Sequence, residues 1–320
     1  MEKLIEVKNL KKWFWMGGAL FGGKEAVRAV DDVSFYIKKR EILGLVGESG
    51  CGKTTCGKVI LRILDPTMGS IYFDNHNITH LKRSEMIKFR RKMMIIYQDP
   101  FGSLDPRMTI GAAIAEPMEV HNTVSKKGKE EKVVEIMGKV GLTPDQMNRY
   151  PHEFSGGQRQ RIGIARALAT NPEFIVADEP VSALDVSIQA QIINLLKDLQ
   201  KEFGLTLLFI AHDLSVVKHI SERVIVMYLG KIVEMAPKKE LFDNPKHPYT
   251  KALLSAIPIP NPGLRRKEEI LMGDVPSPIN PPSGCRFHSR CPYAKDVCKE
   301  KEPELIDLQD KHYVACHLFP

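Results

Sequence analysis

A glycine-rich loop at residues 47–54 constrains the fold more than any other segment; it reads Gly-Glu-Ser-Gly-Cys-Gly-Lys-Thr. It fits the pattern G-x-x-x-x-G-K-[ST], in which glycines let the backbone curl until its N–H groups face bound phosphates. In such a loop Lys53 reaches the β- and γ-phosphates, and the Thr54 hydroxyl ligates Mg²⁺. An apolar run precedes the loop, and a helical stretch follows whose positive N-terminus favours the same anion. The loop therefore predicts a phosphate-binding site in an α/β fold.

Short apolar runs rich in Val, Ile and Phe recur along the first 235 residues and predict buried parallel strands covered by helices. These runs are 42–46, 93–97, 174–177, 205–210 and 223–228. Residues 187–203 carry apolar side chains at the spacing of one helical face. The stretch from about residue 100 to residue 170 has few such runs, which indicates a mostly helical insertion.

Composition excludes several classes of protein. Apolar residues make up 43% of the 320 residues and charged residues 27%, which excludes a disordered chain. No apolar run approaches the roughly 20 residues of a bilayer span, and the charged, alternating N-terminus is not a signal peptide. The net charge of +7 suits anionic partners. Basic and aromatic residues are not interleaved, so we expect no nucleic-acid surface, and a cytoplasmic location is the default.

Polar residues follow three of the predicted strands, where open α/β sheets place their ligands. Asp178 and Glu179 end the strand at 174–177. Asp178 fits a carboxylate that holds Mg²⁺, and Glu179 could orient or deprotonate an attacking water. Gln98 and His212 follow the runs at 93–97 and 205–210. Taken singly, Gln98 would more often be an ordinary surface amide and His212 an ordinary core imidazole.

A second glycine pair, Ser155-Gly156-Gly157-Gln158, opens the amphipathic segment 159–169. A serine and glycines at a helix start form another anion-ready terminus. One nucleotide needs only one such cradle. The second therefore indicates a cap for the nucleotide of a neighbouring subunit, with a plain helix N-cap as the alternative.

These motifs, in this order and spacing, resemble an ABC transporter ATPase over residues 1–235. The resemblance implies a RecA-like core with an antiparallel β subdomain and a helical subdomain at about 100–170. It implies that ATP is held by Phe14, Gly47, Glu48, Ser49, Gly50, Cys51, Gly52, Lys53, Thr54, Thr55, Ser155, Gly156, Gly157 and Gln158, and Mg²⁺ by Thr54, Gln98 and Asp178.

The resemblance also assigns roles to single residues. Ser155–Gln158 would close on the ATP of the opposite subunit, and residues 182–185 would link the two sites. Glu179 would be the catalytic base, His212 the sensor of the γ-phosphate, and Gln98 the link to the membrane subunits. Phe14 lies where the family stacks an aromatic ring on adenine, although Trp13 and Trp15 flank it.

The chain changes character at about residue 236, because 13 of its 21 prolines and four of its six cysteines follow. With the motif His247-Pro-Tyr-Thr, this loop-rich region, 236–320, is similar to the C-terminal extension of oligopeptide and dipeptide importer ATPases, F-type subunits above all. The similarity implies two membrane-spanning permease subunits, a second ATPase in a head-to-tail dimer, an extracytoplasmic peptide-binding protein and a place at the cytoplasmic membrane face. Importers of nickel, glutathione or oligosaccharides, and soluble ABC ATPases, are the alternatives.

Cys285, Cys291, Cys298 and Cys316 suggest a metal-binding extension. Their gaps of five, six and seventeen residues lack the close ligand pairs of structural zinc sites. A cytosolic chain should not keep them as disulfides. Four thiolates suit a [4Fe–4S] cluster, which the resemblance also implies, with zinc and unligated thiols as alternatives.

Overall fold

The computed structural model describes residues 2–16, 25–125, 128–257 and 273–319. The chain forms two compact units. Unit 1 comprises Met1–Leu4, Ile37–Ile42 and His80–Ile210, and unit 2 comprises Ile5–Tyr36, Leu43–Thr79 and Ala211–Pro320. Each unit is described by itself below. Among the described residues, no helix is both long and apolar enough to cross a lipid bilayer.

Parallel strands form the core of unit 1. β7 (Phe174–Asp178) pairs in parallel with β6 (Met93–Ile96) on one side and with β8 (Thr206–Ala211) on the other. Every residue of β7 and β8 is buried, which explains why the sequence of each reads as a continuous apolar run. Parallel pairing brings the carboxyl ends of β6 and β7, with Gln98 and Asp178, to one edge of the sheet.

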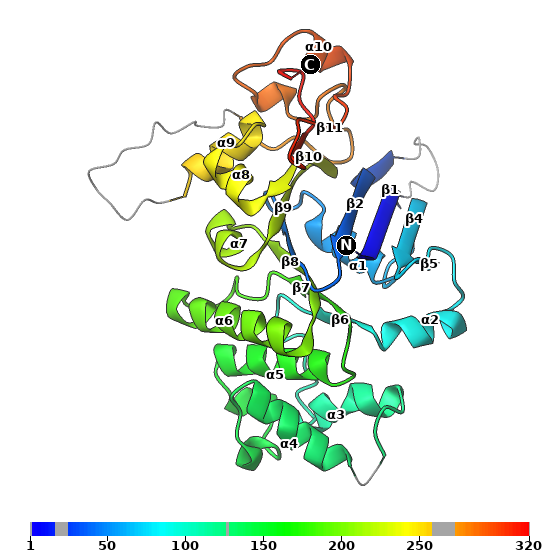
Figure 1. Ribbon diagram of the computed structural model, residues 1–320, viewed down its shortest axis with the longest axis vertical. Helices are drawn as coiled ribbons and strands as arrows, with labels where there is room; N and C mark the ends of the chain where they lie inside the picture. Colours follow the sequence, from blue (N-terminus) through cyan, green and yellow to red (C-terminus); the bar gives the residue numbers. More distant parts are fainter. Residues whose placement is uncertain (1, 17–24, 126–127, 258–272, 320) are drawn as a thin grey trace, which may run out of the picture. The chain divides into compact units, whose positions relative to one another are not determined.

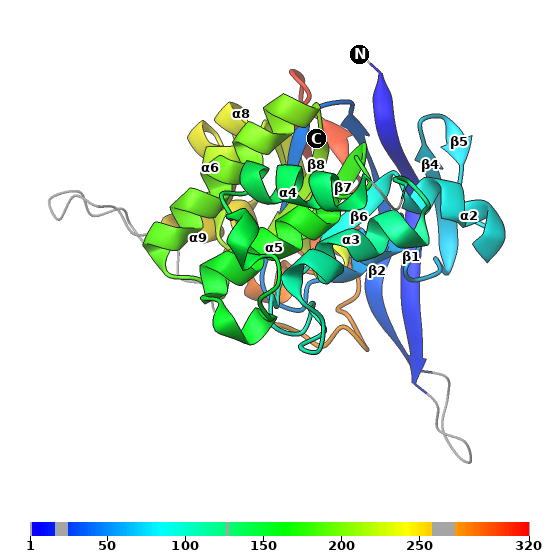
Figure 2. The same cartoon turned by 90° about the horizontal axis from the view of Figure 1, so that it is seen from below.

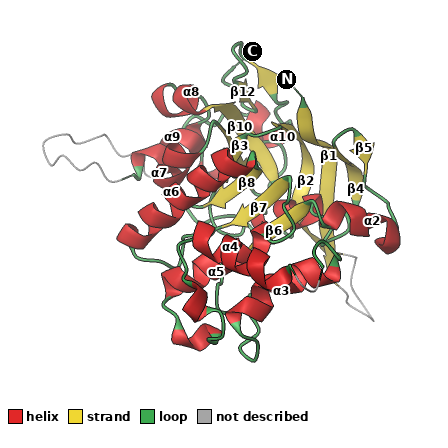
Figure 3. Ribbon diagram, turned by 60° about the horizontal axis from the view of Figure 1, so that its bottom comes forward, coloured by secondary structure: helices red, strands yellow, loops and turns green. Residues whose placement is uncertain are grey.

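Helices make up the rest of unit 1 (Figures 1 and 3). Between β6 and β7 lie α3 (Ile110–Val120), α4 (Lys129–Lys139), the short turns η1 (Pro144–Gln146) and η2 (Pro151–Glu153), and α5 (Gly156–Leu168). The helices α3, α4 and α5 pack on one another through buried apolar side chains. α2 (Arg83–Arg90) precedes β6, and α6 (Val186–Phe203) follows β7. The described residues between 101 and 170 form helices and turns and no strand, and their assignment as a helical subdomain stays a prediction.

A sheet in the order β2-β1-β4-β5 lies in unit 2, and Figure 2 shows the long strands β1 and β2 beside the shorter β4. Its strands are β1 (Lys3–Met16), β2 (Glu25–Lys38), β4 (Met68–Phe73) and β5 (His76–Asn77). The register of β1 on β4 shifts between Lys8 and Lys11, and Asn9 there has a positive φ of 47°. This bulge bends β1 and breaks the alternation by which a strand is read in a sequence.

Unit 2 also contains β3 (Ile42–Val46), which pairs in parallel with β9 (Arg223–Tyr228). β10 (Lys231–Pro237) pairs antiparallel with β9, and then come β12 (Tyr313–Val314) and β11 (Ile306–Asp307). The helices of this unit are α1 (Lys53–Ile60), α7 (Leu214–Ile220), α8 (Lys238–Asp243), α9 (Pro248–Ser255), η3 (His288–Arg290) and α10 (Val297–Glu300).

The C-terminal region is part of unit 2 and shares its core. β12 extends the sheet beside β10, and Tyr249 and Phe287 are among the largest fully buried side chains. Glu234, in the middle of β10, is fully buried and accepts hydrogen bonds from the backbone N–H groups of Lys246 and His247 and from His312 Nε2. The boundary near residue 236 remains a prediction. The region after it is fixed to the preceding strands by these contacts.

Candidate functional site

The phosphate loop connects β3 to α1, as predicted. Gly47 and Gly52 are required there. A Cβ on Gly47 would lie 2.1 Å from the carbonyl oxygen of Met227, and one on Gly52, whose φ is 103°, would lie 1.9 Å from that of Ala29. The N-cap residue of α1 is Gly52, which has no side chain to cap the first turn with Thr54 and Thr55. The backbone thus offers a cradle for an anion.

Lys53 is buried, 4% exposed, and its ammonium group donates to the loop itself. Nζ lies 2.8 Å from the carbonyl oxygen of Gly47 and 3.0 Å from that of Glu48. The Cys51 thiol beside it is buried too, and burial raises its pKa. The loop therefore holds its cation within the cradle, and the thiol contributes no charge at neutral pH.

Gln98 and Glu179 are brought together in unit 1. Gln98 Nε2 donates to Glu179 Oε2 over 3.2 Å. Glu179 has a φ of 44°, unusual for a residue other than glycine, and its N–H donates to the carbonyl oxygen of Ile210. Asp178, at the end of β7, is 3% exposed. A strained backbone thus orients an acid next to an amide at the edge of the parallel strands.

The serine–glycine pair forms the N-terminus of α5, as predicted. The Ser155 hydroxyl accepts the N–H of Gln158 over 3.3 Å, and Gln158 Oε1 accepts the N–H of Ser155 over 3.0 Å, which completes a capping box. Ser155 is nevertheless exposed. A Cβ on Gly157 would lie 2.6 Å from the Ile188 side chain of α6, so helix packing requires that glycine. The predicted cap is thus folded and open to another molecule.

The remaining predicted nucleotide residues lie in unit 2. His212 is exposed and directly follows β8. Phe14, near the end of β1, is 38% exposed, and Lys12 Nζ lies 5.0 Å from its ring centroid. Trp13 and Trp15 meet edge to face at 6.0 Å between centroids, so the strand alternation places Phe14 on the other face of β1. The assignment of adenine to Phe14 stays a prediction.

The four cysteines of the C-terminal region approach one another. The N–H of Cys285 donates to the carbonyl oxygen of Cys298 over 2.8 Å. Burial and, to a smaller extent, the neighbouring thiols of Cys298, Cys316 and Cys291 together raise the pKa of Cys285 to about 12. No group of three or more His, Cys, Asp or Glu side chains in the described residues, however, is arranged to hold a metal ion. The structure therefore does not support the predicted iron–sulfur cluster or the zinc alternative.

Sequence reasoning missed a set of contacts from the C-terminal region to the nucleotide segments. Tyr249 and Arg290 contact Glu48 of the phosphate loop, and Arg286 contacts Asp31, which in turn holds Trp13. Tyr249, Arg286 and Arg290 all lie in motifs that served only for the resemblance. The spacing of 242 residues between Arg290 and Glu48 hides such a pair from any local pattern.

Comparisons with known proteins agree with this geometry. The family described as ABC transporter matches residues 30–182, and the C-terminal region of oligopeptide/dipeptide transporters matches residues 233–298. The chain is 54% identical to the oligopeptide transport ATP-binding protein AppF of Bacillus subtilis, over 99% of this chain and 98% of that protein. It is 53% identical to a putative peptide import ATP-binding protein of Brucella ovis, over 98% and 97% of the two chains.

Solved structures show the same fold. The ATP-binding cassette MJ0796, as a post-hydrolysis dimer with ADP and Pi, has a TM-score of 0.65 at 31% identity. The alignment covers 73% of this chain and 98% of that one. CbiO1 of Clostridium perfringens, from the transporter complex cbiONQ, has a TM-score of 0.66 at 26% identity, over 76% and 92% of the chains.

Proposed function

Because the chain belongs to the family of ATP-binding subunits of oligopeptide ABC transporters, we propose that it hydrolyses ATP to power the import of di- or oligopeptides. The observation that carries the substrate class is the match of the whole chain, C-terminal region included, to peptide-import subunits. The phosphate loop and the Gln98–Glu179 pair supply the groups that ATP hydrolysis requires.

Each unit contributes a distinct part of the reaction. The phosphate loop with Lys53 binds the β- and γ-phosphates, and Mg²⁺, when bound through Thr54, Gln98 and Asp178, neutralises their charge. Glu179 accepts the proton of the attacking water, with Gln98 holding its carboxylate. His212 reports the γ-phosphate. These assignments are supported by the motifs and by the folded loop and strand ends.

We propose a head-to-tail dimer in which Ser155–Gln158 of one subunit caps the ATP of the other. The exposed, preorganised capping box supports it, as does the dimeric state of the related cassettes. Two permease subunits, reached through the segment after Gln98, would transmit closure to the membrane from its cytoplasmic face. An extracytoplasmic peptide-binding protein would deliver the substrate.

Reconstitution tests this function. The chain, co-expressed with its permease and ATPase partners, is placed in proteoliposomes loaded with ATP, and uptake of labelled di- and oligopeptides is counted. Peptide uptake that requires ATP and fails in a Glu179→Gln complex is expected. Uptake of Ni²⁺, glutathione or an oligosaccharide in place of peptides would overturn the peptide assignment while leaving the ATPase intact.

We also keep a metal site at Cys285, Cys291, Cys298 and Cys316 as a proposal, with a [4Fe–4S] cluster first and zinc second. Its support is the donor chemistry: four thiols near one another in a loop-rich region. The arrangement in the described residues is not a metal-binding one, so no step of the ATPase reaction is assigned to it.

A further inference from the structure

The loop at residues 285–291, Cys-Arg-Phe-His-Ser-Arg-Cys, is called the tail loop here; it is fixed to unit 2 by a buried aromatic side chain. Phe287 is 1% exposed, and its ring centroid lies 5.2 Å from that of Tyr228 and 5.4 Å from that of Tyr249. Tyr228 ends β9, and Tyr249 belongs to α9. The two arginines of the tail loop therefore extend from a well-packed base.

Arg290 makes a two-pronged ion pair with the phosphate loop. Its Nη1 and Nη2 donate to the two carboxylate oxygens of Glu48 over 2.8 and 3.1 Å. The side chain is 8% exposed, and the hydrogen bonds to Glu48 raise the pKa of the guanidinium. Paired, partly desolvated charges in this geometry are strong and directional. Arg290 thus fixes the side chain of the residue that follows Gly47.

The backbone of Glu48 is held from both sides. Its N–H donates to the fully buried Tyr249 Oη over 2.8 Å. Its carbonyl oxygen accepts Lys53 Nζ over 3.0 Å and the N–H of Cys51 over 3.3 Å. Glu48 therefore connects the C-terminal region to Lys53, the residue expected to bind the phosphates.

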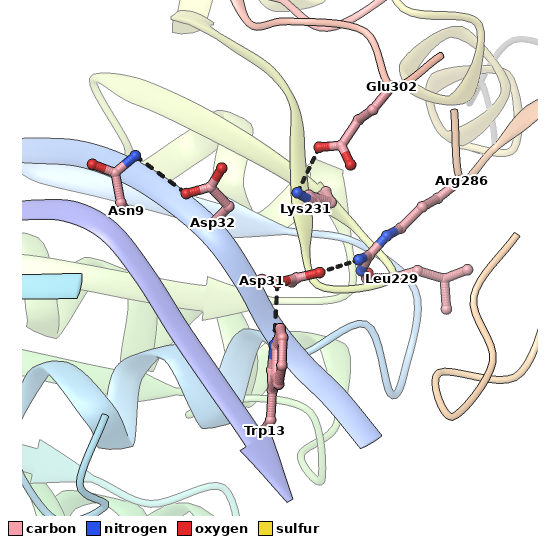
Figure 4. A network of polar contacts seen from close by, with 8 residues as sticks. All are labelled: Asn9, Trp13, Asp31, Asp32, Leu229, Lys231, Arg286 and Glu302. Carbon is pink, nitrogen blue, oxygen red and sulfur yellow. Dashed lines mark hydrogen bonds and ion pairs between the residues drawn. The ribbon is translucent and has the colours of Figure 1, made fainter. Parts of the chain in front are cut away.

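Arg286, at the other end of the tail loop, is linked to residues 13–15 of β1, called the aromatic segment. It donates to one oxygen of the Asp31 carboxylate and to the carbonyl oxygen of Leu229 (Figure 4). The other oxygen of Asp31 accepts the indole N–H of Trp13 over 3.1 Å. Arg286 and Asp31 are 7% and 5% exposed. A buried pair of this kind adds little net stability but fixes one arrangement, because either partner alone would be an uncompensated charge.

Backbone hydrogen bonds join the two arms of the tail loop, which are the contacts of Arg290 and Tyr249 with Glu48 and the contact of Arg286 with Asp31. Gly230, next to Leu229, donates its N–H to the carbonyl oxygen of Cys51 in the phosphate loop over 2.9 Å. The Gly230 carbonyl oxygen accepts the N–H of Asp31 over 2.9 Å. The turn at Leu229 and Gly230, which Arg286 contacts, therefore touches the phosphate loop and also Asp31, the partner of Trp13.

We propose that the tail loop is a positioning element for bound ATP. Arg290 and Tyr249 set the phosphate loop through Glu48. Arg286 sets Trp13, and with it the adjoining aromatic segment, through Asp31. Arg286, Arg290 and Tyr249 do not touch the nucleotide; they act through residues that do.

The two arms predict different losses, which a general structural defect would not produce. In Arg290→Lys and Tyr249→Phe the phosphate loop loosens, so affinity for both ATP and inorganic tripolyphosphate should fall about tenfold. In Arg286→Met residues 13–15 of β1 loosen, so affinity for ATP should fall about tenfold. Affinity for tripolyphosphate should fall much less, because Gly230 still reaches the phosphate loop through its backbone N–H. Both affinities are measured on the full-length chain by competition with a fluorescent ATP analogue.

Intrinsic fluorescence gives a second readout, because Trp13 and Trp15 are the only tryptophans of the chain. Arg286→Met should shift their emission without nucleotide, and Arg290→Lys should not. Glu302→Gln is the matched control: it removes a different ion pair of the C-terminal region, to Lys231 of β10 at 2.5 Å (Figure 4). It should change neither affinity nor emission.

Folding is checked by far-UV circular dichroism, and Tyr249→Phe keeps the ring that packs on Tyr228. Folded Arg290→Lys and Tyr249→Phe proteins with the affinities of the unmodified chain would overturn the proposal for the phosphate loop. Equal losses of ATP and tripolyphosphate in Arg286→Met, or losses as large in Glu302→Gln, would overturn the separate roles of the two arms.

Discussion

At the scale of single residues, hydrogen bonds within the chain fix the charged side chains of the candidate site. Lys53 is turned into the phosphate loop by two carbonyl oxygens. Glu179 is held by Gln98 on a strained backbone. Preorganised groups of this kind stabilise a developing charge without having to move at the moment of reaction. In the proposed mechanism, nucleotide binding and hydrolysis therefore rest on different residues and can be separated by mutation.

Glu179→Gln should separate them. The substitution keeps the shape of the side chain but removes the carboxylate that accepts the proton, so hydrolysis should fall by about 100- to 1,000-fold while ATP still binds. The nucleotide-bound dimer should accumulate, and size-exclusion chromatography with ATP would detect it. Glu173→Gln is the control, because Glu173 precedes β7 at its opposite end and pairs with Lys92 at the surface. Normal turnover by Glu179→Gln would exclude Glu179 as the base.

At the scale of elements, the sequence predicts best what is continuous and buried. The strands at 42–46 and 223–228 have the predicted bounds. β6 and β7 differ from the predicted bounds by one residue at one end, and β8 is shifted by one residue at both ends. On the predicted helical face of α6, Ile192, Leu196 and Leu199 are buried. These elements owe their pattern to a local period, which a sequence displays.

Elements whose stability depends on distant partners could not be read this way. β10 contains Glu234, and a charge inside a strand indicates a loop until its partner is known. That partner is His312, 78 residues away, at 2.7 Å. The candidate site divides likewise: the phosphate loop and Glu179 lie in short motifs, whereas Arg286, Arg290 and Tyr249 act across long separations that no motif records.

Acidification should weaken the element that holds Tyr249. His247 caps α9 through Nδ1, which accepts the N–H of Tyr249, and burial lowers the pKa of His247 from 6.5 to about 4. The unfolded chain thus binds this proton more readily than the folded one. Stability from the neutral ring is present above about pH 6.5 and decreases as the pH falls toward 4, even though Glu234 opposes the shift.

The free energy of unfolding should therefore drop by on the order of 1–2 kcal/mol from pH 7 to pH 5 because of His247 alone. His247→Asn offers a cap that does not titrate, so its loss over this range should be smaller by that amount. Urea unfolding at both pH values measures the difference. An equal loss in both proteins would show that groups other than His247 carry the pH dependence.

Metal content tests the proposed cluster at the four cysteines, whose arrangement in the described residues is not a metal-binding one. If the cluster forms, protein purified without oxygen contains about four irons and four sulfides per chain and absorbs in the visible range. Replacing any one of the four cysteines by serine should bleach it and expose the C-terminal region to protease, while Cys56→Ala, a buried thiol of α1, should not. One zinc per chain would show that the site binds zinc and not an iron–sulfur cluster. Protein free of metal would contradict both assignments.

At the scale of the whole molecule, the exposed capping box of α5 implies that one chain is half of a catalytic assembly. Within a chain, Ser155 satisfies the first turn of its own helix and nothing more. Ser155 is exposed at the α5 N-terminus, which in the proposed head-to-tail dimer meets the nucleotide of a second chain. Hydrolysis should accordingly depend on protein concentration, whereas ATP binding by a single chain should not.

Ser155→Arg tests this division. A bulky cation at the exposed cap leaves the phosphate loop of the same chain untouched, so the dissociation constant of ATP for the isolated chain should stay within about twofold of its value. Closure on the partner's nucleotide should fail, because the arginine fills the space that the γ-phosphate needs, and hydrolysis should fall by about a hundredfold. Equilibrium binding at low protein concentration and turnover at high concentration measure the two effects, with Ser84→Arg, an exposed serine of α2, as the control. If Ser155→Arg instead lowers ATP affinity in the isolated chain, the serine–glycine cap serves the nucleotide of its own subunit, and the head-to-tail arrangement is wrong.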